Sequence, residues 1–153
     1  MVKSFQGVRM APPKKTTAQP LLVKDHMTTK LTTFKPDDTL DQVMEILTKK
    51  KISGAPVLDE SGGLIGIISE VDCLKEIIKG KYTNTPKFPS KVEDHMTKNV
   101  MTLSPEMSLF DAAGKFLEFK IRRFPVVQNG QLLGQISLSD LIRAFPKLRQ
   151  TTW

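Results

Sequence analysis

Two pairs of side chains have the types and spacing that could bind a phosphorylated, hydroxyl-bearing ligand: Ser69 with Asp72, and Ser137 with Asp140. A hydroxyl at a helix start, beside free backbone N–H groups and the positive end of the helix dipole, suits a phosphate. A carboxylate one turn later can accept hydrogen bonds from two neighbouring hydroxyls. Ser-x-x-Asp is also an ordinary helix-capping pattern, so the pairs indicate either a ligand site or a cap.

An internal repeat places the two pairs at equivalent positions. The segment Val23–Thr28 recurs almost unchanged as Val92–Thr97. The register then holds at a constant offset through Pro56 and Pro125, and one residue is lost in the turn that follows. This many matches with one gap indicates two copies of a unit of about 55 residues.

Both copies have the same order of expected elements. Helices are predicted where apolar residues recur with helical spacing, the first of them behind a capping box formed by Thr39 and Gln42. Strands are predicted on either side of a glycine-containing turn. The expected elements are 31–34, a helix from Thr39, 55–58, 64–68 and a helix from Ser69, then 100–103, a helix from Ser108, 124–127, 132–136 and a helix from Ser137. The predicted class is α+β, with two β-α-β-β-α repeats.

The chain divides into five expected segments. Residues 1–21 are basic and lack periodicity, which predicts a flexible N-terminal segment. The two repeats are expected at 22–79 and 92–146. Residues 80–91 are predicted to form the linker between them, and residues 147–153 a C-terminal tail.

The net charge of +7 raises the possibility of nucleic-acid binding. Much of the excess falls in the first twenty residues, which carry Lys3, Arg9, Lys14 and Lys15 and no acidic residue. The rest of the chain is only mildly basic, and no helix-turn-helix pattern or aromatic platform is present. Nucleic acid is therefore an unfavoured partner, and we expect any such binding to be weak and salt-sensitive.

Composition also limits compartment and cofactor. The single cysteine, Cys73, excludes a disulfide framework and a cysteine metal cluster. His26 and His95 each follow an aspartate, but sequence neighbours point apart more often than together, so no metal site is expected. The apolar runs are too short to cross a bilayer, and the N-terminus has no signal-peptide core. We therefore expect a cytoplasmic protein without membrane contact.

The repeated motifs resemble those of cystathionine-β-synthase-type (CBS) repeats, which occur in tandem as Bateman modules. The resemblance covers about residues 22–146 and implies a stand-alone module whose repeats pack with pseudo-two-fold symmetry. It also implies a homodimer, because such pairs usually associate. The motifs that carry it are 25–28, 52–57 and 66–72 in the first copy and 94–97, 121–126 and 134–140 in the second.

The resemblance implies a role for each candidate site residue. Asp72 and Asp140 would bind ribose, and Ser69 and Ser137 would bind phosphate. Arg122 and Arg123 would add phosphate contacts in the second copy, where the first copy has a serine and a glycine, since arginine can grip phosphate oxygens bidentately. The implied adenine pocket is lined by Thr32, Thr33, Ser53, Gly54, Ala55, Met101, Thr102 and Phe124.

The implied function is a non-catalytic regulatory module. It would bind AMP, ADP, ATP, NAD(H) or S-adenosylmethionine between the repeats and signal a conformational change to a regulated partner protein. No catalytic cofactor is implied, and neither a nucleophile–base pair nor a P-loop is present. The alternative is a nucleic-acid-binding or interaction scaffold protein without a small ligand.

Overall fold

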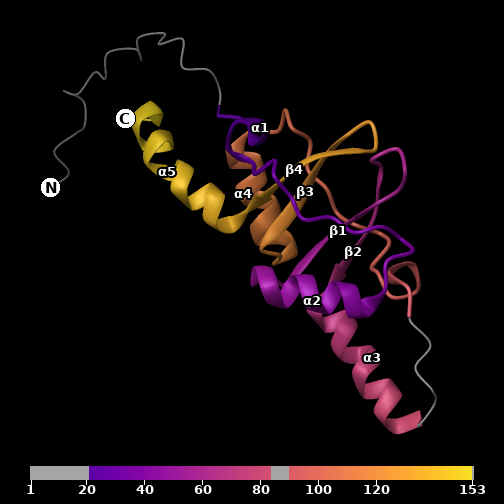
Figure 1. Cartoon of the computed structure of the whole chain (residues 1–153). Helices are drawn as coiled ribbons and strands as arrows, with labels where there is room; N and C mark the ends of the chain where they lie inside the picture. The colour runs from indigo at the N-terminus through magenta and orange to yellow at the C-terminus, as the bar shows by residue number, and fades with distance from the viewer. Residues whose placement is uncertain (1–20, 84–89, 153) are drawn as a thin grey trace, which may run out of the picture.

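The structure of the protein is a computed structural model that describes residues 21–83 and 90–152. Apart from Leu21, the predicted N-terminal segment lies outside these ranges. The elements fall into two groups with the same order along the chain (Figure 1). They are α1 (Val23–His26), α2 (Leu40–Lys50), β1 (Gly54–Leu58), β2 (Leu64–Ser69) and α3 (Glu70–Thr83), then η2 (Val92–Asp94), α4 (Leu109–Phe119), β3 (Arg123–Gln128), β4 (Gln131–Ser137) and α5 (Leu138–Thr152).

Each copy contains one antiparallel hairpin, β1 with β2 and β3 with β4. The expected first strand of each copy is reduced to a single parallel bridge, Phe34 with Val57 and Leu103 with Val126. Pro36 and Pro105 follow these residues closely and cannot donate to a longer ladder. The α+β class and the order of elements are confirmed, with a bridge in place of the first strand.

The lead-in turn of each copy packs against the other copy. Thr28 forms a bridge with Gln135 on β4, and Thr97 forms the equivalent bridge with Ile67 on β2. Val23 is fully buried in the second copy's apolar core. Val92 is likewise buried in the core of the first copy. The sequence repeats therefore exchange their first turns, and neither apolar core is complete without the other copy.

Two glycines permit this exchange. A Cβ on Gly66 would lie 2.9 Å from the carbonyl oxygen of Thr97, and a Cβ on Gly134 would lie 2.8 Å from that of Thr28. Neither distance is possible for a real side chain. The glycine that opens each strand-to-helix motif is thus required where the exchanged chain crosses the strand.

The two hairpins also meet at their turns by equivalent bonds. The backbone N–H of Leu64 donates to Gly130, and that of Leu132 donates to Gly62. Exchanging the two copies converts one bond into the other, as it does for the two exchanged bridges. These reciprocal contacts are what pseudo-two-fold symmetry requires, and they join the copies into one body.

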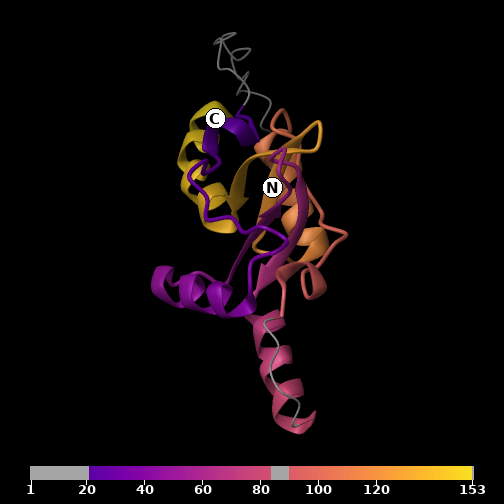
Figure 2. The same ribbon diagram turned by 45° about the vertical axis from the view of Figure 1, so that its right-hand side comes forward.

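The helices around this body differ in length from their predicted extents. The capping box of Thr39 and Gln42 is present at the start of α2. Helix α3 continues to Thr83, within the expected linker, and projects away from the hairpins in both views (Figures 1 and 2). Helix α5 runs through Pro146 to Thr152, within the expected tail. None of the described helices is long and apolar enough to cross a membrane.

Candidate functional site

The first candidate site is the junction between β2 and α3. Ser69 ends the strand, and Asp72 lies in the first turn of the helix. The Oδ2 atom of Asp72 accepts hydrogen bonds from the backbone N–H of Ser69, at 2.8 Å, and from the Ser69 hydroxyl, at 2.9 Å. The pair therefore caps the helix, and the same geometry directs its hydroxyl and carboxylate toward one end of α3.

The second candidate site is the equivalent junction between β4 and α5. The backbone N–H of Ser137 donates to Oδ2 of Asp140 at 2.8 Å. The backbone N–H of Asp140 in turn donates to the Ser137 hydroxyl oxygen at 3.1 Å. Both pairs are thus helix caps, which confirms the capping interpretation of the Ser-x-x-Asp pattern. Whether a ligand also fits depends on the carboxylate oxygens that the caps leave free.

In the second site only, the other carboxylate oxygen of the aspartate also accepts a hydrogen bond. The guanidinium of Arg143 donates to Oδ1 of Asp140 at 2.9 Å. The arginine side chain is 75% exposed, whereas the Asp140 side chain is 13% exposed. The equivalent position in the first copy is Lys75, and Asp72 has no ion pair among the residues that the structure describes.

The predicted phosphate and adenine residues lie beside these junctions. Gly54 pairs with Ser69, and the carbonyl of Ser53 accepts from the backbone N–H of Glu70 at 2.9 Å. The second copy repeats this arrangement, since Arg123 pairs with Ser137. The structure therefore brings Ser53, Gly54, Arg122 and Arg123 next to the cap of their own copy, and the two arginine side chains are exposed.

The predicted adenine-pocket residues that precede the bridges at Phe34 and Leu103 lie along one edge of β1 and of β3. The opposite edges of these strands pair with β2 and β4. Thr32 is half-buried and its hydroxyl accepts a hydrogen bond from Lys50 at 2.9 Å. Thr33, Met101 and Thr102 are exposed. Because Phe34 and Leu103 pair with the strands that carry Pro56 and Pro125, these residues lie along the edges of β1 and β3, and their role in binding adenine stays a prediction.

Two predicted adenine-pocket residues have side chains that point elsewhere. The ring of Phe124 is 1% exposed and packs edge-on against Phe116, with centroids 4.8 Å apart. Ala55 is 3% exposed in the core of the first copy. The alternation of side chains along a strand turns both of them inward, so they can offer only main-chain atoms to a ligand.

The residues that line a pocket with Asp140 from the exchanged turn have no counterpart among the predicted site residues. A pocket of about 300 Å³ lies beside this carboxylate. Its lining is Asp25, His26, Met27, Asp140, Arg143 and Ala144. The motif containing His26 was visible as a repeat, but no sequence signal says that it packs against the other copy. The i, i+3 spacing of Asp140 and Arg143 is the signal that could have identified the arginine.

The equivalent space in the first copy is occupied by an acidic side chain. Glu76 stands where the second copy has Ala144, and its carboxylate lies 3.7 Å from Nδ1 of His95. The Ser90 hydroxyl donates to the other oxygen of Glu76 at 2.9 Å. The lead-in turn of the second copy is therefore held by polar contacts, whereas that of the first copy faces a pocket.

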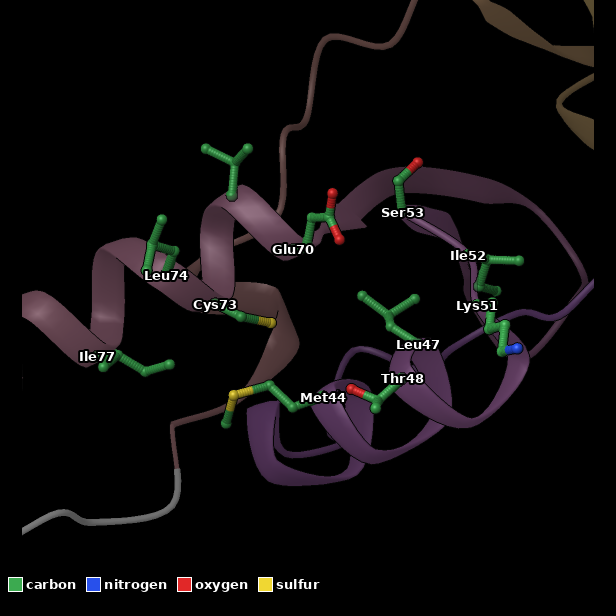
Figure 3. Close-up of a pocket in the computed structure, with 11 residues that line it drawn as sticks. Met44, Leu47, Thr48, Lys51, Ile52, Ser53, Glu70, Cys73, Leu74 and Ile77 are labelled. Atoms are coloured by element: carbon green, nitrogen blue, oxygen red, sulfur yellow. The ribbon is translucent and has the colours of Figure 1, made fainter.

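An apolar groove of about 730 Å³ separates α2 from α3. Figure 3 shows Met44 and Leu47 of α2 opposite Cys73 of α3, with Ser53 and Glu70 at one end of the groove. Cys73 is buried, and this burial raises the pKa of its thiol above the ordinary value. Leu74 and Val71 on α3 are more than half exposed, which leaves this face without a partner in the single chain.

Metal chemistry has no support in the described residues. They include no group of three or more histidine, cysteine or acidic side chains arranged to hold a metal ion. The polar features of the two sites are thus caps, hydroxyls and exposed arginines.

Comparison with known proteins identifies the fold. The model of the CBS domain family matches residues 23–79 and 92–147. The chain belongs to the CBS-domain family. It is similar to the uncharacterized protein MJ1426 of Methanocaldococcus jannaschii, with 33% identity over 81% of this chain and 90% of that protein.

Solved CBS pairs share the architecture. The crystal structure of CBSX2, an Arabidopsis thaliana protein, in complex with AMP matches with a TM-score of 0.73 and 32% identity, over 84% of this chain and 98% of that chain. The CBS domain pair of protein MJ0100, in complex with 5-methylthioadenosine and S-adenosylmethionine, matches with a TM-score of 0.68 and 28% identity over the same shares. The predicted tandem CBS module is confirmed.

Proposed function

We propose that this CBS pair is a non-catalytic regulatory module that binds adenine nucleotides. The observation that carries the proposal is the duplicated Ser-x-x-Asp pair, at the strand-to-helix junction of both copies. A capping role alone explains each pair separately. Two solved CBS pairs that share this fold have adenosine compounds bound, which supports an adenosine-containing ligand for this chain.

The polar atoms of the junctions match the parts of a nucleotide. Asp72 and Asp140 accept hydrogen bonds from the ribose hydroxyls, and Ser69 and Ser137 turn their hydroxyls to the phosphate at the helix N-terminus. The adenine base lies against the segments that precede the bridges Phe34–Val57 and Leu103–Val126. Those edges consist of Thr32, Thr33, Ser53 and Gly54 in the first copy and Met101 and Thr102 in the second.

Charge distinguishes the phosphates that each copy accepts. Arg122 and Arg123 are exposed next to Ser137, and guanidinium groups bind phosphate oxygens bidentately. The first copy has Ser53 and Gly54 at these positions. Ligands with several phosphates, such as ATP, ADP or NAD(H), therefore gain most from the second copy's arginines, whereas AMP and S-adenosylmethionine depend less on them.

Thermal unfolding with each candidate ligand selects the ligand class. A ligand that binds only the folded protein, present at about a hundred times its Kd, adds about 2.7 kcal/mol of stability. For a chain of this size, we expect an increase in Tm of about 5–10 °C. AMP, ADP, ATP, NADH and S-adenosylmethionine are tested in parallel, with inorganic phosphate as the control. An unchanged Tm with all five ligands contradicts the proposal.

The α2–α3 groove supports a second copy of the chain as its occupant. Leu74 and Ile77 are 54% and 43% exposed on a helix that projects from the body. Burying such side chains stabilises an interface by roughly 25 cal/mol per Å² of apolar surface. We expect a homodimer by sedimentation equilibrium. Leu74→Asp should make it monomeric, and Leu133→Asp, on the exposed face of β4, should not.

Ligand binding regulates a partner only through a difference in affinity between two arrangements of the module. The exchanged turns are the elements that join the copies. A nucleotide held at Asp140 touches the same pocket as Asp25–Met27, so it can favour one position of this turn. The regulated partner protein then recognises that arrangement.

A further inference from the structure

The two sites differ in the basic residue three positions after the aspartate. It is Lys75 after Asp72 and Arg143 after Asp140. Arg143 donates to Oδ1 of Asp140 at 2.9 Å. Oδ2 of the same carboxylate accepts from the backbone of Ser137. Both oxygens of Asp140 therefore have a hydrogen-bond partner in the chain without ligand.

The carboxylate of Asp72 is partnered on one oxygen only. Its Oδ2 accepts both bonds from Ser69. Within residues 21–83 and 90–152, no hydrogen bond or ion pair reaches Oδ1. A ribose presents two adjacent hydroxyls, each of which needs an acceptor lone pair. The first site offers an open oxygen, whereas the second offers one on which a guanidinium already lies.

The pocket beside Asp140 has room for the Arg143 guanidinium when a ligand displaces it. The space next to Arg143 is open because Ala144 replaces the first copy's Glu76. Its lining also includes Asp25, whose carboxylate is an alternative partner for a displaced arginine. The Arg143 side chain is 75% exposed, so the ion pair is a weak one that a ligand can break.

We propose that Arg143 competes with the ligand's ribose for Asp140, so that the two sites bind unequally and the Asp72 site fills first with a ligand that has no phosphates. This inference rests on the proposed function and adds an order of filling to it. The competition is a property of this chain's second copy, because the equivalent Lys75 does not reach Asp72. A ligand at the second site must displace the guanidinium before its diol can bind.

Adenosine is the probe for this competition, because it carries the ribose and no charge. Asp72→Ala removes the first site's acceptor, so that the second site can be titrated alone by calorimetry. Adding Arg143→Ala to this variant should tighten adenosine binding about two- to fivefold, the range of an exposed ion pair. The matched control is Lys75→Ala in the Asp140→Ala variant, where adenosine affinity should not change. Circular dichroism confirms that each variant is folded.

Salt gives a second measurement that does not depend on the arginine substitution. Raising the salt concentration screens the Arg143–Asp140 pair, so adenosine binding by the Asp72→Ala variant should strengthen. Binding by the Asp140→Ala variant should stay constant. Because adenosine is neutral, salt does not weaken its own contacts.

Several results would overturn the inference. Unchanged or weaker adenosine binding after Arg143→Ala shows that the arginine does not compete, even if both sites bind. A second site that stays silent with and without Arg143 is closed by another group. No adenosine or nucleotide binding by the wild-type chain removes the proposed function and this inference together. Nucleotide binding combined with equal, salt-independent adenosine affinities of the two sites removes only the inference.

Discussion

The two copies of the CBS repeat share the contacts that join their backbones and differ in the residues around Asp72 and Asp140. Gly66 and Gly134, and Thr28 and Thr97, make the same close crossings. Beside the cap of Asp72, however, the first copy has Ser53, Gly54 and Lys75. Beside the cap of Asp140 the second copy has two exposed arginines, Arg122 and Arg123, and a third, Arg143, that forms an ion pair with Asp140. The two copies have kept the residues that close the fold and the Ser-x-x-Asp pairs, and they differ in the charged residues beside those pairs.

The two apolar cores differ as well. The second copy has an aromatic pair, Phe116 and Phe124, at 4.8 Å. The matched positions in the first copy are Leu47 and Ala55, both buried. The second copy has the larger side chains at these two positions, whereas Phe34 and Val43 of the first copy match the smaller Leu103 and Ala112.

The largest effect should come from removing the aromatic side chain that the second copy has added. Phe124→Ala leaves a cavity in a fully buried position, and such truncations cost about 3–5 kcal/mol. Urea unfolding should show this loss. Phe110→Ala is the control, because Phe110 is 59% exposed on α4, and its change should be small. A loss below about 1 kcal/mol at Phe124 would mean that the ring is not part of a packed core.

The crossing glycines should give the next largest effect, and an equal one in both copies. Gly66→Ala and Gly134→Ala each force a Cβ against a backbone carbonyl oxygen, and overpacking of this kind costs about 1–3 kcal/mol. Gly114→Ala is the control, since nothing lies within 4 Å of its Cβ position on α4. That change should stabilise the helix by about 0.5–1 kcal/mol. Equal unfolding midpoints for all three variants would contradict the exchanged packing.

The arginines should separate the two copies by their response to phosphate. Arg122→Ala in the Asp72→Ala variant should weaken ATP binding by about 0.5–1.5 kcal/mol, the range of a net hydrogen bond. Adenosine binding should not change. Calorimetric titration of both ligands gives the comparison, and an equal loss for adenosine and ATP would place Arg122 outside the phosphate contacts.

The smallest expected effect lies in the hairpin turns. Hydrogen bonds from the Ser61 hydroxyl and from backbone N–H groups, chiefly that of Gly63, lower the pKa of Asp59 below its ordinary value of 3.8. The folded state therefore favours the ionised carboxylate. Its stabilising contribution is present above the unfolded pKa and is lost as pH falls through the lower folded pKa.

The second copy has Asn129 in its turn and no carboxylate there. Asp59→Asn should therefore lower the urea midpoint near neutral pH, and the difference from wild type should shrink as the pH falls below about 4. A difference that stays constant with pH would mean that Asp59 is not held in its ionised form by the fold.

Most of the helices, strands and turns could be predicted from the sequence, because they are determined by residues close together in the chain. The Thr39–Gln42 capping box and the hairpin turns each depend on residues a few positions apart, and the repeat doubled every signal. The reduction of each first strand to one bridge depends on the prolines after it and on which strand it meets. That second condition is not local.

The exchange of Val23 and Val92 between cores could not be predicted, because repeat alignment matches positions without saying which copy they pack against. For the same reason the pocket formed by His26 and Asp140 was missed. Phe124 was assigned to the adenine pocket from its place in a motif. Strand alternation, read from the fully buried Val126, would have turned it inward.

The central claim is that Asp72 and Asp140 bind nucleotide in addition to capping α3 and α5. The most direct test is calorimetric titration of AMP into the wild-type chain, the Asp72→Ala/Asp140→Ala double variant and Asp111→Ala. Asp111 has the same Ser-x-x-Asp spacing at the start of α4, where its backbone N–H donates to the Ser108 hydroxyl, so Asp111→Ala is the control for losing a first-turn aspartate that has no proposed ligand. Each lost ribose contact should cost about 1.5–3 kcal/mol. We predict that the double variant loses AMP binding and Asp111→Ala keeps it. AMP binding by a folded double variant, with wild-type affinity, would contradict the account.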